Sequence, residues 1–120
     1  MTTTTKTNWI DICQLQDIPR NTGVCADLQG TQVAIFHIQP RNLEGVSQIK
    51  AVSNFDPFAR ANVLSRGLIT ELDDKYRIAS PLLKQQFCLD TGICEQDESV
   101  SISTFESRIH NGFVQLKEVS

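Results

Sequence analysis

Cysteine and histidine are the side chains best suited to hold a metal or act as nucleophiles, and this chain has few of them. It contains four cysteines and two histidines, His37 and His110. No two cysteines form a Cys-x-x-Cys pair, and neither histidine lies within a ligand-like step of a cysteine. Structural zinc sites usually show such close pairs. The sequence therefore carries no zinc-site signature; its cysteines are Cys13, Cys25, Cys88 and Cys94.

Cys88 and Cys94 flank an expected turn and could face each other across it. Disulfides belong mainly to exported proteins. The N-terminal residues Met1–Lys6 are polar, and no apolar stretch of signal-peptide length follows them. We therefore expect reduced cysteines in a cytoplasmic protein. We interpret Cys88 and Cys94 as small core residues, with a functional disulfide as the minor alternative.

Nucleophilic catalysis would need Ser80 or Cys88 beside a base, and the sequence offers no such arrangement. Both imidazoles lie on expected strands, where His37 alternates with apolar neighbours and His110 borders a tight turn. We interpret His37 as a core or edge residue. No Gly-x-Ser-x-Gly motif, phosphate-binding loop or dinucleotide fingerprint is present. We predict that this chain has no catalytic residue and no cofactor-binding residue.

The composition is that of an ordinary globular protein, with 40% hydrophobic and 21% charged residues. Eleven basic and fourteen acidic residues give a net charge of −3, which argues against a nucleic-acid partner or an anionic membrane surface. The apolar runs fall far short of the roughly 18 residues that a membrane span needs. We predict one domain over residues 8–118, preceded by a flexible Thr-rich tail over residues 1–7.

Short strand patterns separated by turn dipeptides run along most of the chain. The clearest is residues 31–38, where alternate apolar side chains follow the Gln29-Gly30 turn. Asp73-Asp74 and Asp90-Thr91-Gly92 mark two further hairpins. The expected strands are 9–13, 23–28, 31–38, 46–52, 68–72, 76–80, 86–89, 93–95 and the pair described next. This pattern predicts an all-β fold of about nine or ten strands, either a sandwich or a small, partly open barrel.

Asn111-Gly112 is the dipeptide favoured in a two-residue hairpin turn. Counting outward predicts that His110 pairs with Phe113, Ile109 with Val114, and Ser107 with Leu116. This register places Phe105, Ile109, Val114 and Leu116 on one face, as a half-buried hairpin requires. A short helical turn over residues 105–109 is the alternative, and we prefer the strand.

Two long connections, residues 53–67 and 81–85, interrupt the strands. Their segments are Asn54-Phe55-Asp56-Pro57-Phe58, Val63-Leu64-Ser65-Arg66-Gly67 and Ala79-Ser80-Pro81-Leu82-Leu83, the last running on to Phe87 and Thr91-Gly92. These segments resemble the two ligand loops of Rieske domains, which read Cys-Pro-His and Cys-Pro-x-His-Gly. The resemblance implies a Rieske-like antiparallel β-sandwich or partly open barrel with both loops at one tip.

The four ligand positions of Rieske loops carry other residues here. By position, Asp56 and Ser80 stand where Rieske proteins have cysteines, and Phe58 and Leu83 stand where they have histidines. A Rieske cluster needs two thiolates on one iron and two imidazoles on the other. Phe58 and Leu83 have no donor atom, so we expect no metal ligand and no iron–sulfur cluster. We expect these two side chains to form an apolar plug that joins the loops.

The loops, with Asn21-Thr22-Gly23-Val24-Cys25-Ala26 and Val114-Gln115-Leu116, resemble the small subunits of assimilatory NAD(P)H-dependent nitrite reductases over residues 9–116. The resemblance implies a non-redox subunit of an ammonia-forming oxidoreductase in nitrate assimilation, with no catalytic chemistry of its own. It implies a large partner subunit that holds FAD, sirohaem, an iron–sulfur cluster and NAD(P)H and reduces nitrite. The alternative is a clusterless Rieske-fold interaction module for another oxidoreductase.

Partners of Rieske proteins dock at the tip that the two ligand loops form, so the resemblance implies that this tip meets the large subunit. Aromatic and arginine side chains often dominate the energy of such interfaces. The alternative is that the phenylalanines only hold the loops together and the charged residues are solvated. The candidate contact residues are Phe55, Phe58, Arg60, Arg66, Leu82 and Lys84.

Overall fold

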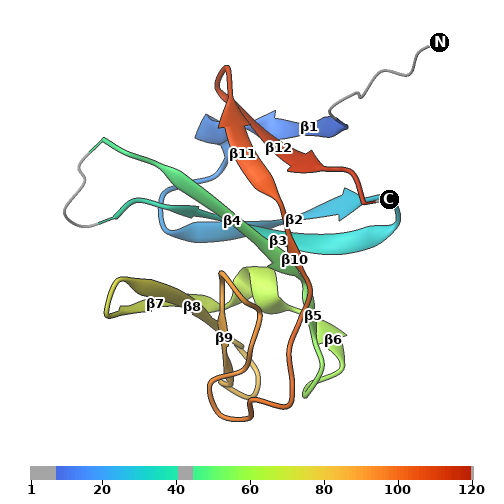
Figure 1. Cartoon of the computed structure of the whole chain (residues 1–120), viewed down its shortest axis with the longest axis vertical. Coiled ribbons are helices and arrows are strands. Elements are labelled where there is room, and N and C mark those ends of the chain that lie inside the picture. Colours follow the sequence, from blue (N-terminus) through green and yellow to red (C-terminus); the bar gives the residue numbers. More distant parts are fainter. Residues whose placement is uncertain (1–7, 41–44, 120) are drawn as a thin grey trace.

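The computed structural model describes residues 8–40 and 45–119, so the expected tail over residues 1–7 lies outside it (Figure 1). Within these ranges the regular elements are twelve strands and two single-turn 3-10 helices. None of the helical turns in the described part of the chain approaches the length and apolarity of a membrane-crossing helix. The elements are β1 (Trp9–Gln14), η1 (Leu15–Asp17), β2 (Thr22–Leu28), β3 (Thr31–Ile38), β4 (Gln48–Ser53), β5 (Phe55–Asp56), β6 (Ala61–Asn62), η2 (Leu64–Arg66), β7 (Leu68–Leu72), β8 (Lys75–Ala79), β9 (Gln86–Cys88), β10 (Thr104–Phe105), β11 (Ser107–His110) and β12 (Phe113–Lys117).

The strands form antiparallel sheets with the orders β1-β12-β11, β10-β4-β3-β2, β5-β6 and β7-β8-β9. The chain passes from β10 to β11 across one residue, Glu106, so residues 104–110 join the first two sheets. The combined strand order is β1-β12-β11-β10-β4-β3-β2, and the barrel stays open because the two end strands, β1 and β2, do not pair with each other. In Figure 1 these two sheets lie in the upper part, and β5 to β9 form the lower end. The all-β, partly open architecture is confirmed.

Strand β3 lies between two hydrophobic cores, because side chains alternate between the two faces of a strand. Val33 and Ile35 enter one core, and Ala34, Phe36 and Ile38 enter the other. The first, which we call the barrel core, contains the buried residues Ile18, Leu28, Val33, Ile35, Ala51, Val114 and Leu116. The second, the tip core, contains Ala34, Phe36, Ile38, Val52, Leu64, Ile78, Phe87, Leu89, Cys94 and Ile102.

His37 is a structural residue of β3, as its apolar neighbours indicated. Its side chain is only 5% exposed. One ring nitrogen, Nδ1, lies 2.7 Å from the backbone oxygen of Ile18, and Nε2 lies 2.8 Å from the hydroxyl of Ser47. Both nitrogens are therefore satisfied within the fold, as a buried imidazole requires.

The predicted C-terminal hairpin is confirmed, and the helical alternative is wrong. Asn111 and Gly112 have φ values of 53° and 81°, the left-handed pair that a type I′ turn needs. The register of β11 with β12 matches the count from the turn: Ser107 opposite Leu116, Ile109 opposite Val114, and His110 opposite Phe113. The same conformation occurs at Gln29-Gly30 and Asp73-Asp74.

Three sequence-based expectations need correction. The expected strand over residues 93–95 is wrong, since only two isolated bridges form there, from Cys94 to Phe87 and from Ile93 to Ser101. Because Phe87 stands opposite Cys94, Cys88 does not face Cys94 across the turn, and all four cysteines are free thiols. The long connection after Ser53 also contains β5, β6 and η2, which the loss of alternation did not predict.

Candidate functional site

The two long connections meet at the lower end of the molecule in Figure 1, as the Rieske resemblance implied. We call residues 54–67 the first tip loop and residues 80–85 the second tip loop. The first contains β5, β6 and η2, and the second joins β8 to β9. One direct link between them is a hydrogen bond from the hydroxyl of Ser80 to Asp56 Oδ2, at 2.5 Å.

Asp56 is fully buried, and its carboxylate organises the first tip loop. Oδ1 accepts hydrogen bonds from the backbone N–H groups of Phe58, at 2.9 Å, and Ala59, at 3.3 Å. Such contacts with the backbone two and three residues ahead form an Asx turn. The backbone oxygen of Asp56 accepts a further bond from the N–H of Arg60, at 2.7 Å. One side chain therefore shapes its own loop and binds the other.

Ser80 has the corresponding role in the second tip loop and is 2% exposed. Its hydroxyl accepts a bond from the N–H of Leu82, at 3.3 Å, while donating to Asp56. Its backbone N–H donates to the oxygen of Gln85, at 2.9 Å, and its backbone oxygen accepts from the N–H of Lys84, at 3.2 Å. These bonds close a tight loop. With its hydroxyl buried and bonded, Ser80 is not arranged as a nucleophile.

Asn54 forms hydrogen bonds that hold the base of the first tip loop. The sequence did not predict this role. Its amide nitrogen donates to Gln32 Oε1, at 3.1 Å, and contacts Cys25 Sγ at 3.4 Å. Its Oδ1 accepts from the N–H of Ser65 at 2.7 Å, and its backbone oxygen accepts from the N–H of Leu64 at 3.1 Å. A polar side chain directly after the end of β4 was the available signal. Asn54 ties both ends of the loop to β3.

The predicted apolar plug is right for Phe58 and wrong for Leu83. Phe58 is half-buried, and its ring packs on Phe87 of the tip core with the ring centroids 6.1 Å apart. Leu83 is 52% exposed, because the turn held by the Ser80 hydroxyl leaves the middle of the second loop at the surface. The Asp56–Ser80 bond, rather than an apolar contact, joins the two loops.

The candidate contact residues divide into two groups. Phe58 is held against the tip core, so it is poorly placed as an anchor for a partner. The other apolar candidates are accessible, with Phe55 42% and Leu82 55% exposed. The charged candidates are exposed as well; they are Arg60, Arg66 and Lys84.

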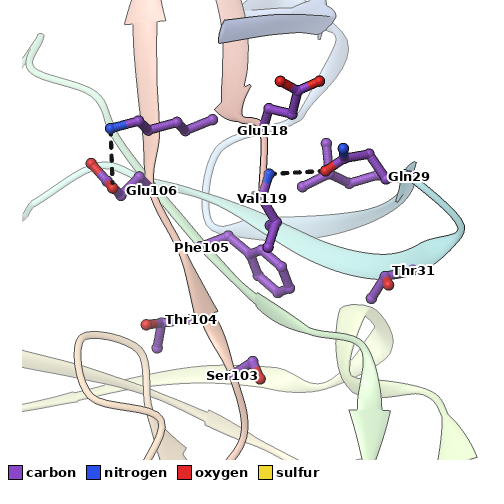
Figure 2. Close-up of a pocket in the computed structure, with 10 residues that line it drawn as sticks. Gln29, Thr31, Ser103, Thr104, Phe105, Glu106, Glu118 and Val119 are labelled. Atoms are coloured by element: carbon purple, nitrogen blue, oxygen red, sulfur yellow. Dashed lines mark hydrogen bonds and ion pairs between the residues drawn. The ribbon is translucent and has the colours of Figure 1, made fainter. Parts of the chain in front are cut away.

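A separate hollow of about 750 Å³ lies where the C-terminal end of β12 passes β10 and the β2–β3 turn (Figure 2). Two of its charged side chains form an ion pair, with 3.6 Å between Lys117 Nζ and Glu106 Oε2. The N–H of Val119 donates to Gln29 Oε1 at 2.9 Å, and Phe105 lies against Val119 in the figure. Its described lining residues include no cysteine or histidine.

The iron–sulfur cluster of Rieske domains does not fit the residues at the tip. The residues at the two cysteine positions, Asp56 and Ser80, are bonded directly to each other, and soft thiolates are replaced by a carboxylate and a hydroxyl. The residues at the two histidine positions are Phe58 and Leu83, which have no donor atom. Across residues 8–40 and 45–119, no group of three or more His, Cys, Asp or Glu side chains could hold a metal ion.

Comparisons with known proteins agree with this fold. Residues 8–117 match the family model described as a Rieske-like [2Fe-2S] domain. The nitrite reductase (NADH) small subunit of Escherichia coli is 48% identical over 109 residues, which cover 91% of this chain and 96% of that protein. The NMR structure of the Escherichia coli protein NirD is 46% identical with a TM-score of 0.80, covering 96% of this chain and all of that one.

A third relative differs in size. The nitrite reductase [NAD(P)H] large subunit of Klebsiella oxytoca is 34% identical over 107 residues, which cover 88% of this chain and 10% of that protein. A domain similar to this chain is therefore part of a much longer polypeptide in that organism. On the family model, the identities and the shared fold, this chain belongs to the Rieske-like family and, within it, to the family of nitrite reductase (NADH) small subunits.

Proposed function

We propose that this chain is the non-redox small subunit of an NAD(P)H-dependent nitrite reductase that forms ammonium in nitrate assimilation. The observation that supports it best is the Klebsiella oxytoca large subunit, in which a domain similar to this chain is covalently part of the large polypeptide. Covalent joining keeps two domains at a high effective concentration. A separate chain of the same family needs an interface to reach the same arrangement.

In this proposal the working domain is residues 8–118 and the compartment is the cytoplasm. FAD, sirohaem, the iron–sulfur cluster and the NAD(P)H site belong to the large subunit. The residues at the tip support this division, because Asp56 and Ser80 bond to each other and Phe58 packs on Phe87. The small subunit then contributes surface and shape rather than electron transfer.

Activity of the paired subunits tests the proposal directly. The large subunit is expressed with and without this chain, and nitrite-dependent NADH oxidation is measured in both preparations. We expect the two proteins to co-purify and the activity per large subunit to be higher with the chain present. A chain that neither co-purifies with the sirohaem protein nor changes its activity would instead be a module for another oxidoreductase.

The purified chain should be colourless and contain no stoichiometric iron. The reason is that neither the Asp56–Ser80 pair nor the apolar side chains of Phe58 and Leu83 offer the thiolate and imidazole ligands of a Rieske cluster. Iron analysis and electron paramagnetic resonance of the dithionite-reduced protein provide the measurement. About two irons per chain with a Rieske-type resonance would show that the prediction is wrong.

We also propose that the tip is the surface that meets the large subunit. Phe55 and Leu82 would supply exposed apolar anchors. Arg60, Arg66 and Lys84 would supply charged contacts around them. Apolar anchors surrounded by such groups match the usual anatomy of an interface. Phe58, in contrast, supports the tip from inside.

Arg66→Ala and Lys84→Ala should each weaken binding to the large subunit by roughly 1–3 kcal/mol. Thermal stability should not change, since both side chains are exposed. Titration calorimetry with the purified large subunit measures the binding, and Arg20→Ala, another exposed arginine outside the tip loops, is the matched control. If both tip variants bind like the unmodified chain while Phe58→Ala unfolds the domain, the tip is structural and the interface lies elsewhere.

A further inference from the structure

The two strands at the ends of the open barrel order, β1 and β2, leave a cleft between them. Sheet order places each of them at an edge, because β1 pairs only with β12 and β2 pairs only with β3 among the described strands. The cleft has a volume of about 500 Å³ and is lined by β1, β2 and the η1 connection between them. It is separate from the tip loops, none of whose residues line it.

Strand β2 presents free backbone groups to this cleft. Leu28 and Thr31 flank the two-residue turn, so they exchange backbone hydrogen bonds, and alternate pairs along β2 do the same. Cys25 and Asp27 occupy the intervening positions, so their N–H and C=O groups point away from β3. Gln32, which stands opposite Asp27 on β3, agrees with this alternation. Its backbone oxygen points away from β2 and accepts from the N–H of Asn54 on the far side of β3.

The floor of the cleft is apolar and belongs to the barrel core. Its apolar residues pack against that core as half-buried side chains: Ile10, Ile12, Cys13, Val24 and Ala26. Burial, with a smaller contribution from the Asp17 carboxylate, raises the pKa of Cys13, so this side chain stays a neutral thiol. An occupant of the cleft would therefore meet uncharged side chains at its base.

The rim of the cleft is acidic. Asp11 on β1, Asp17 in η1 and Asp27 on β2 are exposed, and no lysine or arginine is among the described residues that line the cleft. Asp11 is hydrogen-bonded to Gln115, at 2.6 Å, so its position is defined. Carboxylates on both sides of an apolar floor complement a segment that carries Lys or Arg beside apolar side chains.

We propose that this cleft binds an extended basic and apolar segment of the large subunit, which pairs with the free edge of β2. Strand addition of this kind takes its affinity from backbone hydrogen bonds and its selectivity from alternate side chains. Strand β1 is a poorer template, because its pairing with β12 shifts register between Asp11 and Cys13. A second copy of the chain would bring the same carboxylates to the cleft, so like charges oppose self-pairing. The inference rests on the proposed function and adds a contact separate from the tip.

Hydrogen exchange in the complex of this chain with the large subunit tests the pairing. Mass spectrometry should show amide exchange at Cys25 and Asp27 slowed about tenfold or more on complex formation. The double variant Asp11→Lys and Asp27→Lys should bind the large subunit at least about tenfold more weakly, because it reverses one charge on each side of the cleft. Glu71→Lys with Glu98→Lys changes the net charge equally at exposed positions that do not line the cleft, and it should bind like the unmodified chain.

The outcomes separate this inference from the proposed function. A complex that forms with unchanged exchange along β2, or that tolerates the reversed aspartates, overturns the cleft inference and leaves the subunit assignment standing. Self-association of the isolated chain with protection of β2, seen by sedimentation equilibrium and hydrogen exchange, overturns it in favour of a second copy. If no complex forms with the large subunit at all, the proposed function fails, and the cleft inference fails with it.

Discussion

Replacing Asp56 with alanine should destabilise the isolated domain by about 3 kcal/mol, because buried donors would lose their acceptor. The carboxylate accepts from two backbone N–H groups and from the hydroxyl of Ser80, and it is fully buried. Each buried donor left without a partner costs about 1–3 kcal/mol, and relief from burying the carboxylate itself offsets part of that sum. Urea unfolding measures the change as a lower midpoint with an unchanged slope.

Two further variants locate the effect in the bond between the loops. Asp56→Asn keeps an acceptor for the amides of Phe58 and Ala59, so it should cost only about 1 kcal/mol. Ser80→Ala removes the hydroxyl alone. Because both substitutions remove the same hydrogen bond, the double variant should lose less free energy of unfolding than the sum of the two single variants. In a double-mutant cycle the coupling energy should be about 1–2 kcal/mol. Independent, additive effects of the two alanine substitutions would show that the hydrogen bond does not join the loops.

Gly67→Ala should destabilise the domain by about 2–3 kcal/mol through overpacking at the point where the two tip loops approach. A Cβ atom at Gly67 would lie 2.2 Å from the backbone oxygen of Ala79, the residue directly before Ser80. The backbone of Gly67 has φ −78° and ψ −177°, which alanine adopts readily, so the cost is steric. The added methyl group would push β7 and β8 apart beside the Asp56–Ser80 bond.

Gly30→Ala is the matched control for this prediction. Gly30 has a φ of 88°, but no heavy atom lies within 4 Å of a Cβ at that position. Its substitution should therefore cost only the left-handed backbone penalty, about 1 kcal/mol. Thermal unfolding of the two variants side by side gives the comparison. Equal destabilisation at both positions would contradict the close approach of the loops.

The parts of the fold that could be predicted from the sequence are those specified by local patterns. Residues 31–38 alternate and follow a Gln-Gly turn, and β3 occupies that range. The register of the last hairpin follows from counting outward from Asn111-Gly112, because a two-residue turn leaves one register for its strands. The strand expected over residues 93–95 is wrong, since the isolated bridges at Ile93 and Cys94 produce no periodic pattern.

The link between the tip loops depends on contacts that no local pattern records. Asp56 and Ser80 are 24 positions apart, and Leu83 is exposed because hydrogen bonds to the side chain and backbone of Ser80 shape its loop. The resemblance nevertheless held a usable signal. Two cysteines that bind one iron must lie side by side, so residues at their positions should touch. A carboxylate and a hydroxyl in contact form a hydrogen bond, which replaces the expected apolar plug.

The position of β3 between two cores has a consequence for how the molecule unfolds. Val33 and Ile35 anchor the strand in one core, and Phe36 anchors the same strand in the other. Detaching the tip from β3 would expose Phe36 to water, and detaching the sheet β1-β12-β11 would expose Val33 and Ile35. Neither half can open alone at low free energy, so the chain should behave as one cooperative unit whose slowest-exchanging amides lie along β3.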